Sequence, residues 1–288
     1  TMARDKQCLE AVERIKEKQG SEEQGLNLRD LQLTQLPDNL TEIKQLKTLN
    51  LSGNRLTELP EWFEQLTQLQ SLNLSHNQLT ALPKWLGQFK QLKELRVSYN
   101  LLTELPDSLG HLTQLNYLDI SKNKLISFPS SLSLLTNLSL LYLGGNNFRV
   151  LPEWIGNLSS LEELSIAESE LTSFPEQLRK LLKLQQLYLH NNQITSLPDW
   201  LTQLKELNRL VLYNNPLNFE VAEVYKQGLD AVKAYLHAKA DSITLNEAKL
   251  ILVGEGEVGK SCLLDSLLKK PFQPHDSTHG IEIQSFNV

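Results

Sequence analysis

A repeat of 23 residues is the feature that most constrains how this chain of 288 residues can fold. The stretch LKTLNLSGNRLTELPEWFEQLTQ from Leu46 is followed by LQSLNLSHNQLTALPKWLGQFKQ from Leu69, with Leu, Asn and Pro at matching positions. About nine such units span residues 23–219 without an insertion. A fixed period of this length predicts a stack of similar units in which each unit contacts only its neighbours.

Each unit combines a strand pattern with a turn and an irregular segment. Leu49 and Leu51 flank Asn50, which is the period of two of a strand with one buried face. Asn54 is expected to bond backbone groups of the turn that would otherwise be buried and unpaired. Pro60 is expected to open an irregular or short helical segment on the convex side, where it need not donate to a ladder. The asparagine column holds Asn54, Asn77, Asn100, Asn123, Asn146, Asn192 and Asn215, with Leu31 and Ser169 in two units.

The pattern L-x-x-L-x-L-x-x-N-x-L-x-x-L-P resembles the leucine-rich repeat family, over about two thirds of the chain. The resemblance implies an α/β solenoid with a curved parallel sheet on its concave face. Because the ends of a solenoid expose apolar edges, both ends need caps. We expect an N-terminal capping helix over residues 2–22, the repeats over 23–219, a C-terminal capping helix over 220–239 and a linker over 240–247. The apolar faces of the two caps are predicted to be Cys8, Leu9, Val12 and Ile15, and Leu229, Val232, Tyr235 and Leu236.

In leucine-rich repeats, the strand positions between the leucines line the concave face. Here these positions are small and polar in the first units and aromatic from the middle of the chain onwards. Exposed Tyr with Arg is typical of protein interfaces. One alternative is docking of the rest of the same protein, and another is no role, because strands favour Tyr in any case. The predicted partner-binding patch consists of Arg96, Tyr99, Tyr117, Tyr142, Tyr188, Arg209 and Tyr213.

A second motif follows the repeats: GEGEVGKS, from Gly254 to Ser261, matches G-x-x-x-x-G-K-[ST] in full. The run KLILV before it suits a buried parallel strand, and the leucines of SCLLDSLLKK have helical spacing. In such a loop the backbone amides cradle phosphates, the lysine reaches the β- and γ-phosphates and the serine holds magnesium. The predicted nucleotide-binding residues are Gly254, Glu255, Gly256, Glu257, Val258, Gly259, Lys260, Ser261, Cys262 and Thr278.

The stretches EAKLILVGEGEVGKSCLL and THGIEI, placed after leucine-rich repeats, resemble the Roco family. That resemblance implies a Ras-like GTPase domain, called Roc, with its N-terminal part at residues 248–288, and a dimerising COR domain downstream. It implies GTP or GDP as ligand, Mg²⁺ on Ser261 and Thr278, and a homodimer through COR. The repeats would then regulate a GTPase switch by binding a protein partner or the protein's own downstream domains.

The sequence departs from the Roco pattern after Thr278, where no D-x-x-G or N-K-x-D segment follows. We therefore expect this chain to be the N-terminal region of a longer GTPase, with weak nucleotide binding or none and no turnover of its own. The alternative is a non-catalytic leucine-rich repeat scaffold whose nucleotide segment is vestigial. An immune-type receptor with an ATPase fits less well, because there the ATPase usually precedes the repeats.

Composition and charge indicate which partners and which cellular compartment to expect for the protein. The formal net charge of -6 disfavours a nucleic-acid binder. Two cysteines far apart, Cys8 and Cys262, favour a reducing compartment over a disulfide framework. The charged N-terminus lacks the apolar region of a secretory signal. The sequence contains no run of eighteen apolar residues, so no membrane-spanning helix is predicted. A cytoplasmic protein is therefore expected.

Overall fold

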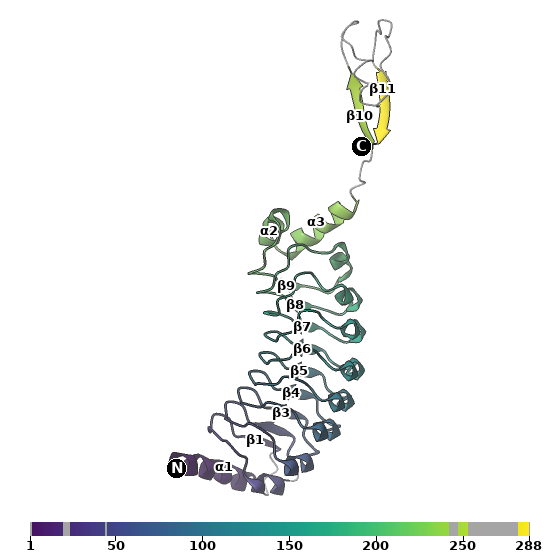
Figure 1. Cartoon of the computed structure of the whole chain (residues 1–288). Coiled ribbons are helices and arrows are strands. Elements are labelled where there is room, and N and C mark those ends of the chain that lie inside the picture. Colours follow the sequence, from purple (N-terminus) through teal and green to yellow (C-terminus); the bar gives the residue numbers. More distant parts are fainter. Residues whose placement is uncertain (1, 20–23, 44, 242–246, 253–281, 288) are drawn as a thin grey trace. The chain divides into compact units, whose positions relative to one another are not determined.

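The computed structural model describes residues 2–19, 24–43, 45–241, 247–252 and 282–287 (Figure 1). Residues up to 237 and residues from 238 onwards form two compact units, which are described separately. The first unit is a solenoid whose nine strands form one parallel sheet in chain order. The strands are β1 (Gly25–Asn27), β2 (Thr48–Asn50), β3 (Ser71–Asn73), β4 (Glu94–Arg96), β5 (Tyr117–Asp119), β6 (Leu140–Tyr142), β7 (Glu163–Ser165), β8 (Gln186–Tyr188) and β9 (Arg209–Val211).

Neighbouring strands pair with an offset equal to the sequence repeat, so that Leu49 lies beside Leu72 and Asn50 beside Asn73. The central leucine of each strand from β2 to β9 is buried. The residues on either side of it face away from the core, and equivalent residues of successive units form columns across the sheet. This register confirms the predicted solenoid and its concave columns.

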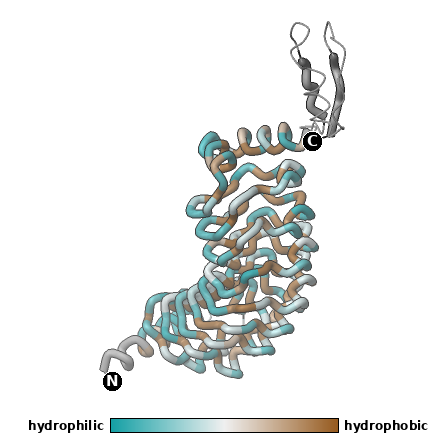
Figure 2. Tube along the Cα trace, turned by 45° about the horizontal axis from the view of Figure 1, so that its top comes forward, coloured by the Kyte–Doolittle hydropathy of each residue, from teal (hydrophilic) through white to brown (hydrophobic). Residues whose placement is uncertain are grey.

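Short 3-10 helices run along the convex side, opposite the sheet (Figure 1). Each begins directly after a proline; Pro60, for example, precedes η2 and has a φ of −69°. This confirms the predicted role of the proline column. The core between the two sides is filled by residues such as Leu46, Leu56 and Phe63, and Figure 2 shows hydrophobic segments repeating from coil to coil. The 3-10 helices are η1 (Asp38–Glu42), η2 (Glu61–Gln65), η3 (Lys84–Gln88), η4 (Asp107–His111), η5 (Ser130–Leu134), η6 (Glu153–Asn157), η7 (Glu176–Lys180) and η8 (Asp199–Gln203).

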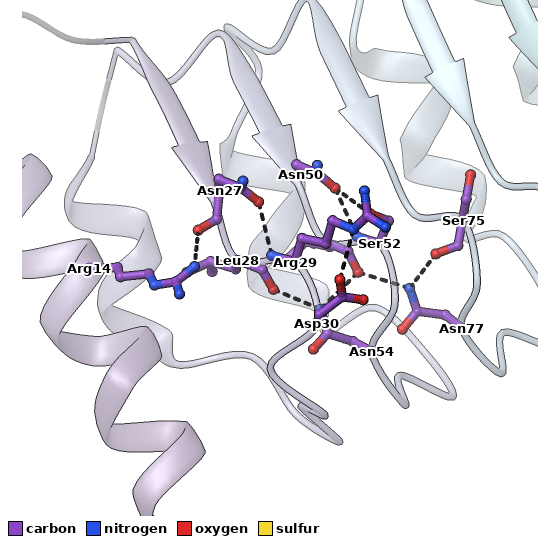
Figure 3. A network of polar contacts seen from close by, with 11 residues as sticks. Arg14, Asn27, Leu28, Arg29, Asp30, Asn50, Ser52, Asn54, Ser75 and Asn77 are labelled. Atoms are coloured by element: carbon purple, nitrogen blue, oxygen red, sulfur yellow. Dashed lines mark hydrogen bonds and ion pairs between the residues drawn. The ribbon is translucent and has the colours of Figure 1, made fainter.

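Where the asparagine is present, its column joins a coil to the one before it. Asn54 accepts a hydrogen bond from the Leu33 N–H at 2.9 Å and donates to the carbonyls of Leu28 and Leu51, both at 2.9 Å. Figure 3 shows part of this network, in which the Asn54 amide reaches Leu28 of the previous coil. Later asparagines repeat these contacts, for example Asn100 with the N–H of Leu79. The ladder confirms that these side chains pair buried backbone groups.

The N-terminal cap is helix α1 (Met2–Lys18). Among its side chains that the structure describes, from Cys8 onwards, Ala11 and Ile15 are buried, so the predicted apolar face is only partly right. Cys8 and Leu9 are exposed, Leu9 by 61%. Arg14 of this helix donates to the carbonyl of Asn27 at 2.9 Å, which ties the cap to β1 (Figure 3).

The C-terminal cap consists of two helices, where the sequence predicted one helix over 220–239. Helices α2 (Phe219–Lys226) and α3 (Leu229–Asp241) are separated by Gly228, whose φ of +105° interrupts helical geometry. The Tyr225 hydroxyl accepts from the Leu212 N–H at 2.9 Å and donates to the Leu210 carbonyl at 3.3 Å. The hydroxyl thereby pairs backbone groups of the last strand, for which no tenth strand provides partners.

The second unit contains strands β10 (Glu247–Leu252) and β11 (Glu282–Asn287). They pair antiparallel, with Leu250 beside Gln284, so the parallel setting predicted for the KLILV strand is wrong for this pairing. Two strands alone pair better antiparallel, and the described residues of this unit contain no further strand. Residues 240 and 241 continue α3 and residue 247 begins β10, which shortens the expected linker.

Candidate protein-binding surface

The seven residues predicted for partner binding all lie on the concave side of the sheet or in the turns that follow its strands, and we call them the concave tyrosine patch. Arg96, Tyr117, Tyr142, Tyr188 and Arg209 lie on strands β4, β5, β6, β8 and β9. Tyr99 and Tyr213 lie in the turns after β4 and β9 and are 49% and 52% exposed. The strand members are fixed by the ladder of the sheet. The turn members are fixed by backbone hydrogen bonds, from the Tyr99 N–H to the Ser121 carbonyl at 3.1 Å and from the Asn191 N–H to the Tyr213 carbonyl at 3.0 Å, and their rings are held by stacking.

Arg96, Tyr117 and Tyr142 form one cluster at the centre of the patch. The guanidinium of Arg96 lies 4.4 Å from the centre of the Tyr117 ring, a cation–π contact. The Tyr117 and Tyr142 rings are tilted against each other with centroids 5.4 Å apart. Arg96 also forms an ion pair with Glu94 of the same strand. The cluster is therefore held by contacts on several sides before any partner arrives.

The Tyr142 hydroxyl donates to Glu163 Oε1 of the next strand at 2.6 Å. Burial raises the pKa of Tyr142, and the hydrogen bond to the carboxylate raises it further. Burial is also the main cause of the raised pKa of Tyr117. Both phenols therefore remain protonated near neutral pH, and Tyr142 keeps its proton to donate to Glu163.

A second cluster lies at the C-terminal end of the sheet. Arg209 lies 5.3 Å from the centre of the Tyr188 ring, and the Tyr188 hydroxyl donates to Gln186 Oε1 at 2.8 Å. Tyr213 stacks on His190 with ring centroids 4.5 Å apart. Burial lowers the pKa of His190, which favours the neutral ring in this stack.

Tyr99 belongs to a third group, since it stacks on His76 with centroids 4.2 Å apart. A hollow lies next to this stacked pair on the concave side, where the first units carry small polar side chains. Its volume is about 510 Å³. Figure 3 shows part of its lining, including Asp30 and Ser75, which lie in the turns after β1 and β3. The hollow is lined by Arg29, Asp30, Ser52, Gly53, Asn73, Ser75, His76, Arg96, Ser98 and Asp119.

The sequence prediction left out the polar residues that hold the patch together. Glu94 and Glu163 each bond a patch residue, and His76 and His190 each carry a tyrosine ring. They occupy the same columns as the tyrosines, which is the signal that could have found them. They were not selected because single charged residues on a strand are ordinarily solvated.

The predicted nucleotide-binding residues, Gly254 to Cys262 and Thr278, lie outside the described residues. Among the residues that the structure does describe, no group of three His, Cys, Asp or Glu side chains is placed to hold a metal ion. Within the same residues no helix is long and apolar enough to cross a membrane.

Comparison with protein families agrees with this fold. Models described as "Leucine Rich repeats (2 copies)", "Leucine-rich repeat region" and "Leucine rich repeat" match residues 44–87, 86–173 and 159–217. The matched residues run from 44 to 217 and include strands β2 to β9. The chain therefore belongs to the leucine-rich repeat proteins. A search of curated proteins found no match.

Solved structures extend the comparison. A leucine-rich repeat protein of Leptospira interrogans is 29% identical with a TM-score of 0.51, over 71% of this chain and 69% of that one. An internalin of Listeria monocytogenes is 25% identical with a TM-score of 0.57, over 64% and 53%. The Arabidopsis receptor kinase HAESA, solved with the peptide hormone IDA and a co-receptor, is 34% identical with a TM-score of 0.62, over 68% and 35%. This chain thus spans about half of the internalin and about a third of the receptor kinase.

Proposed function

We propose that the solenoid is a protein-interaction domain that binds a protein partner on the concave tyrosine patch. The observation that carries this proposal is the set of tyrosine rings already fixed on the sheet by stacking, cation–π contacts and hydrogen bonds. Rings that are ordered before binding lose little conformational entropy when a partner covers them. Tyr and Arg are also the residues that most often dominate binding energy at interfaces. A related solenoid, that of the receptor kinase, was solved with a peptide hormone.

The test uses peptides selected from a displayed random library on the full chain. Replacing Tyr142 and Tyr188 together by Ala should weaken binding of the selected peptides by about a hundredfold, since two hot-spot truncations together remove at least about 3 kcal/mol. The matched control replaces Leu134 and Leu182 by Ala, which are exposed by 56% and 59% away from the sheet. Peptides that bind the tyrosine variant as tightly as the unchanged chain would disprove the proposal.

We further propose that the chain belongs to a Roco-type GTP-binding protein, in which the repeats report partner binding to a GTPase switch. The support is the sequence: GEGEVGKS in full, preceded by the KLILV run and followed by THGIEI. Lys260, Ser261 and Thr278 would contact the phosphates and Mg²⁺. A bound GTP would supply the bond whose hydrolysis resets the switch. The rival reading, a scaffold with a vestigial nucleotide segment, differs in requiring no nucleotide.

The experiment that separates the two readings is a titration of labelled GDP and GTP, with ATP as competitor, into this chain and into the natural full-length protein. A Roco-type switch predicts guanine-nucleotide binding by the full-length protein that is lost in Lys260→Ala, with binding to the 288-residue chain weak or absent. The matched control is Lys249→Ala, which removes a lysine from β10, before the phosphate loop. Absence of binding in the full-length protein would favour the scaffold.

A further inference from the structure

We infer that the centre of the concave tyrosine patch is a subsite for a cationic side chain, arginine or lysine, of the bound partner. The subsite consists of Tyr142 with Tyr117, Leu140, Asp119 and Glu163, on strands β5, β6 and β7. The inference rests on the proposed protein-binding function and adds the chemistry by which the partner is recognised.

The chain itself shows how a cation is held on this surface. Three tyrosines of the patch lie on strands, and two of them carry a guanidinium of the same chain: Arg96 on Tyr117 at 4.4 Å and Arg209 on Tyr188 at 5.3 Å. Tyr142 lies on the strand next to Tyr117, and in the part of the chain that the structure describes no cation lies over its ring. It is thus the one member of the three whose face is left for a cation from outside.

The charge beside Tyr142 is negative. Glu163 accepts the hydrogen bond of the Tyr142 hydroxyl through Oε1. Its Oε2 has no hydrogen bond or ion pair among the described residues. Asp119 lies beside Tyr142 in the register of the sheet. Its Oδ1 accepts both the N–H and the hydroxyl of Ser121, at 3.0 and 2.6 Å, and its Oδ2 has no partner in the described ranges either. Each carboxylate therefore keeps one oxygen for a donor from outside.

Glu94 shows the contrast. Both of its oxygens are engaged, one by Arg96 and the other by the Ser71 hydroxyl at 3.2 Å. The equivalent carboxylate near Tyr142 is Glu163, which lies in the same column as Glu94 three units further on. Neither Glu163 nor Asp119 forms an ion pair with any described residue, although Arg96 is the register neighbour of Asp119. No cation of the described residues pairs with Glu163, so its charge is available to a cation of a partner.

The floor of the subsite suits the stem of such a residue. Leu140 lies between Tyr117 and Glu163 in one row of the sheet and is only half-buried. The aliphatic stem of Arg or Lys packs on apolar surface while its charged head reaches a polar group. Leu140 and the two rings provide the apolar surface, and the two carboxylates provide acceptors. An acidic side chain would be repelled here, and a neutral one would leave both carboxylates unpaired.

The test is an NMR titration of the full chain, labelled at its tyrosine rings, with acetyl-arginine-amide and with the uncharged analogue acetyl-citrulline-amide. We expect a saturable shift of the Tyr142 signal with arginine only. In Glu163→Gln the affinity should fall about tenfold or more, because a charge-assisted hydrogen bond is lost. The control Glu170→Gln should behave as the unchanged chain, since Glu170 is exposed and pairs with Arg149 at 3.3 Å, outside the subsite. Thermal melting of each variant shows whether it is folded.

Equal shifts with citrulline, or an arginine shift that survives in the double variant Asp119→Asn, Glu163→Gln, would overturn the inference. The selected peptides distinguish this failure from failure of the proposed function. If they require Tyr142 but bind equally well after each Arg and Lys is replaced by citrulline or norleucine, the protein-binding function stands and the cation subsite is refuted. If they do not depend on Tyr142 and Tyr188, the protein-binding proposal itself is wrong.

Discussion

At the scale of single residues, the asparagine ladder is interrupted at Ser169, inside the stack of coils. Where other units have Asn, Ser169 donates to the Ala167 carbonyl at 3.2 Å within its own turn. It makes no hydrogen bond to the N–H of Phe148, the group that an asparagine would serve by the spacing seen elsewhere. Glu170, the next residue, has φ of +54°, as Gln32 with φ of +52° has after Leu31. In both units that lack the asparagine, the following residue thus adopts a left-handed conformation, which costs about 1 kcal/mol or more.

This asymmetry predicts opposite effects for two matched substitutions. Ser169→Asn should raise the free energy of unfolding by about 1 kcal/mol, because it supplies the missing bonds. Asn100→Ser should lower it by about 1–3 kcal/mol, because the Leu79 N–H and the Leu74 carbonyl lose their partner. Urea unfolding of the two variants measures both values. A destabilising Ser169→Asn would show that this turn has no room for the longer side chain.

At the scale of elements, glycines set how closely the 3-10 helices stack. A Cβ on Gly110 of η4 would lie 2.3 Å from the Ser131 carbonyl oxygen of η5, and one on Gly87 of η3 would lie 2.3 Å from the Ser108 carbonyl oxygen of η4. The corresponding residue of η5 is Ser133. The close contact from η3 to η5 thus depends on the absence of a side chain, and it ends where the glycine column is interrupted.

We therefore expect Gly110→Ala to destabilise the solenoid by about 1–3 kcal/mol, since backbone must move to admit the methyl group. Ser133→Ala, at the same position one unit later, is the control and should change the free energy of unfolding by less than about 0.5 kcal/mol. Equilibrium unfolding compares the two variants. Equal effects would mean that the glycine contact does not limit the stacking of the helices.

At the scale of the whole molecule, the two ends of the solenoid are closed by different means. Helix α1 covers the first coil with Ala11 and Ile15. At the other end, Val232 and Leu236 of α3 are buried, and Lys233 donates to the carbonyls of Leu204 and Leu207 at 3.2 and 2.8 Å. These contacts serve apolar and polar groups that an inner coil would have shared with its neighbour. The caps lie outside the repeat because each meets a coil on one side only.

The repeat by itself determined the strands, their register and the columns of the concave face. The reason is that each coil rests on an almost identical one, so a step of 23 residues leaves one way to place Leu49 beside Leu72. All seven patch residues could therefore be predicted on one side of the molecule. The phosphate motif at Gly254–Ser261 stays a prediction from sequence, because it lies outside the described residues.

Only the tertiary structure decided which side chains of different columns contact each other. The contacts of Arg96 with Tyr117 and of Tyr142 with Glu163 cross from one strand to another along diagonals, and side-chain direction sets them. The caps lie outside the repeat, so periodicity does not determine their structure. The buried face of α1 and the break at Gly228 depend instead on the coils that the caps contact. Periodicity fixes where a residue lies on the solenoid, whereas contacts between non-equivalent side chains have no period and appear only when the coils are packed.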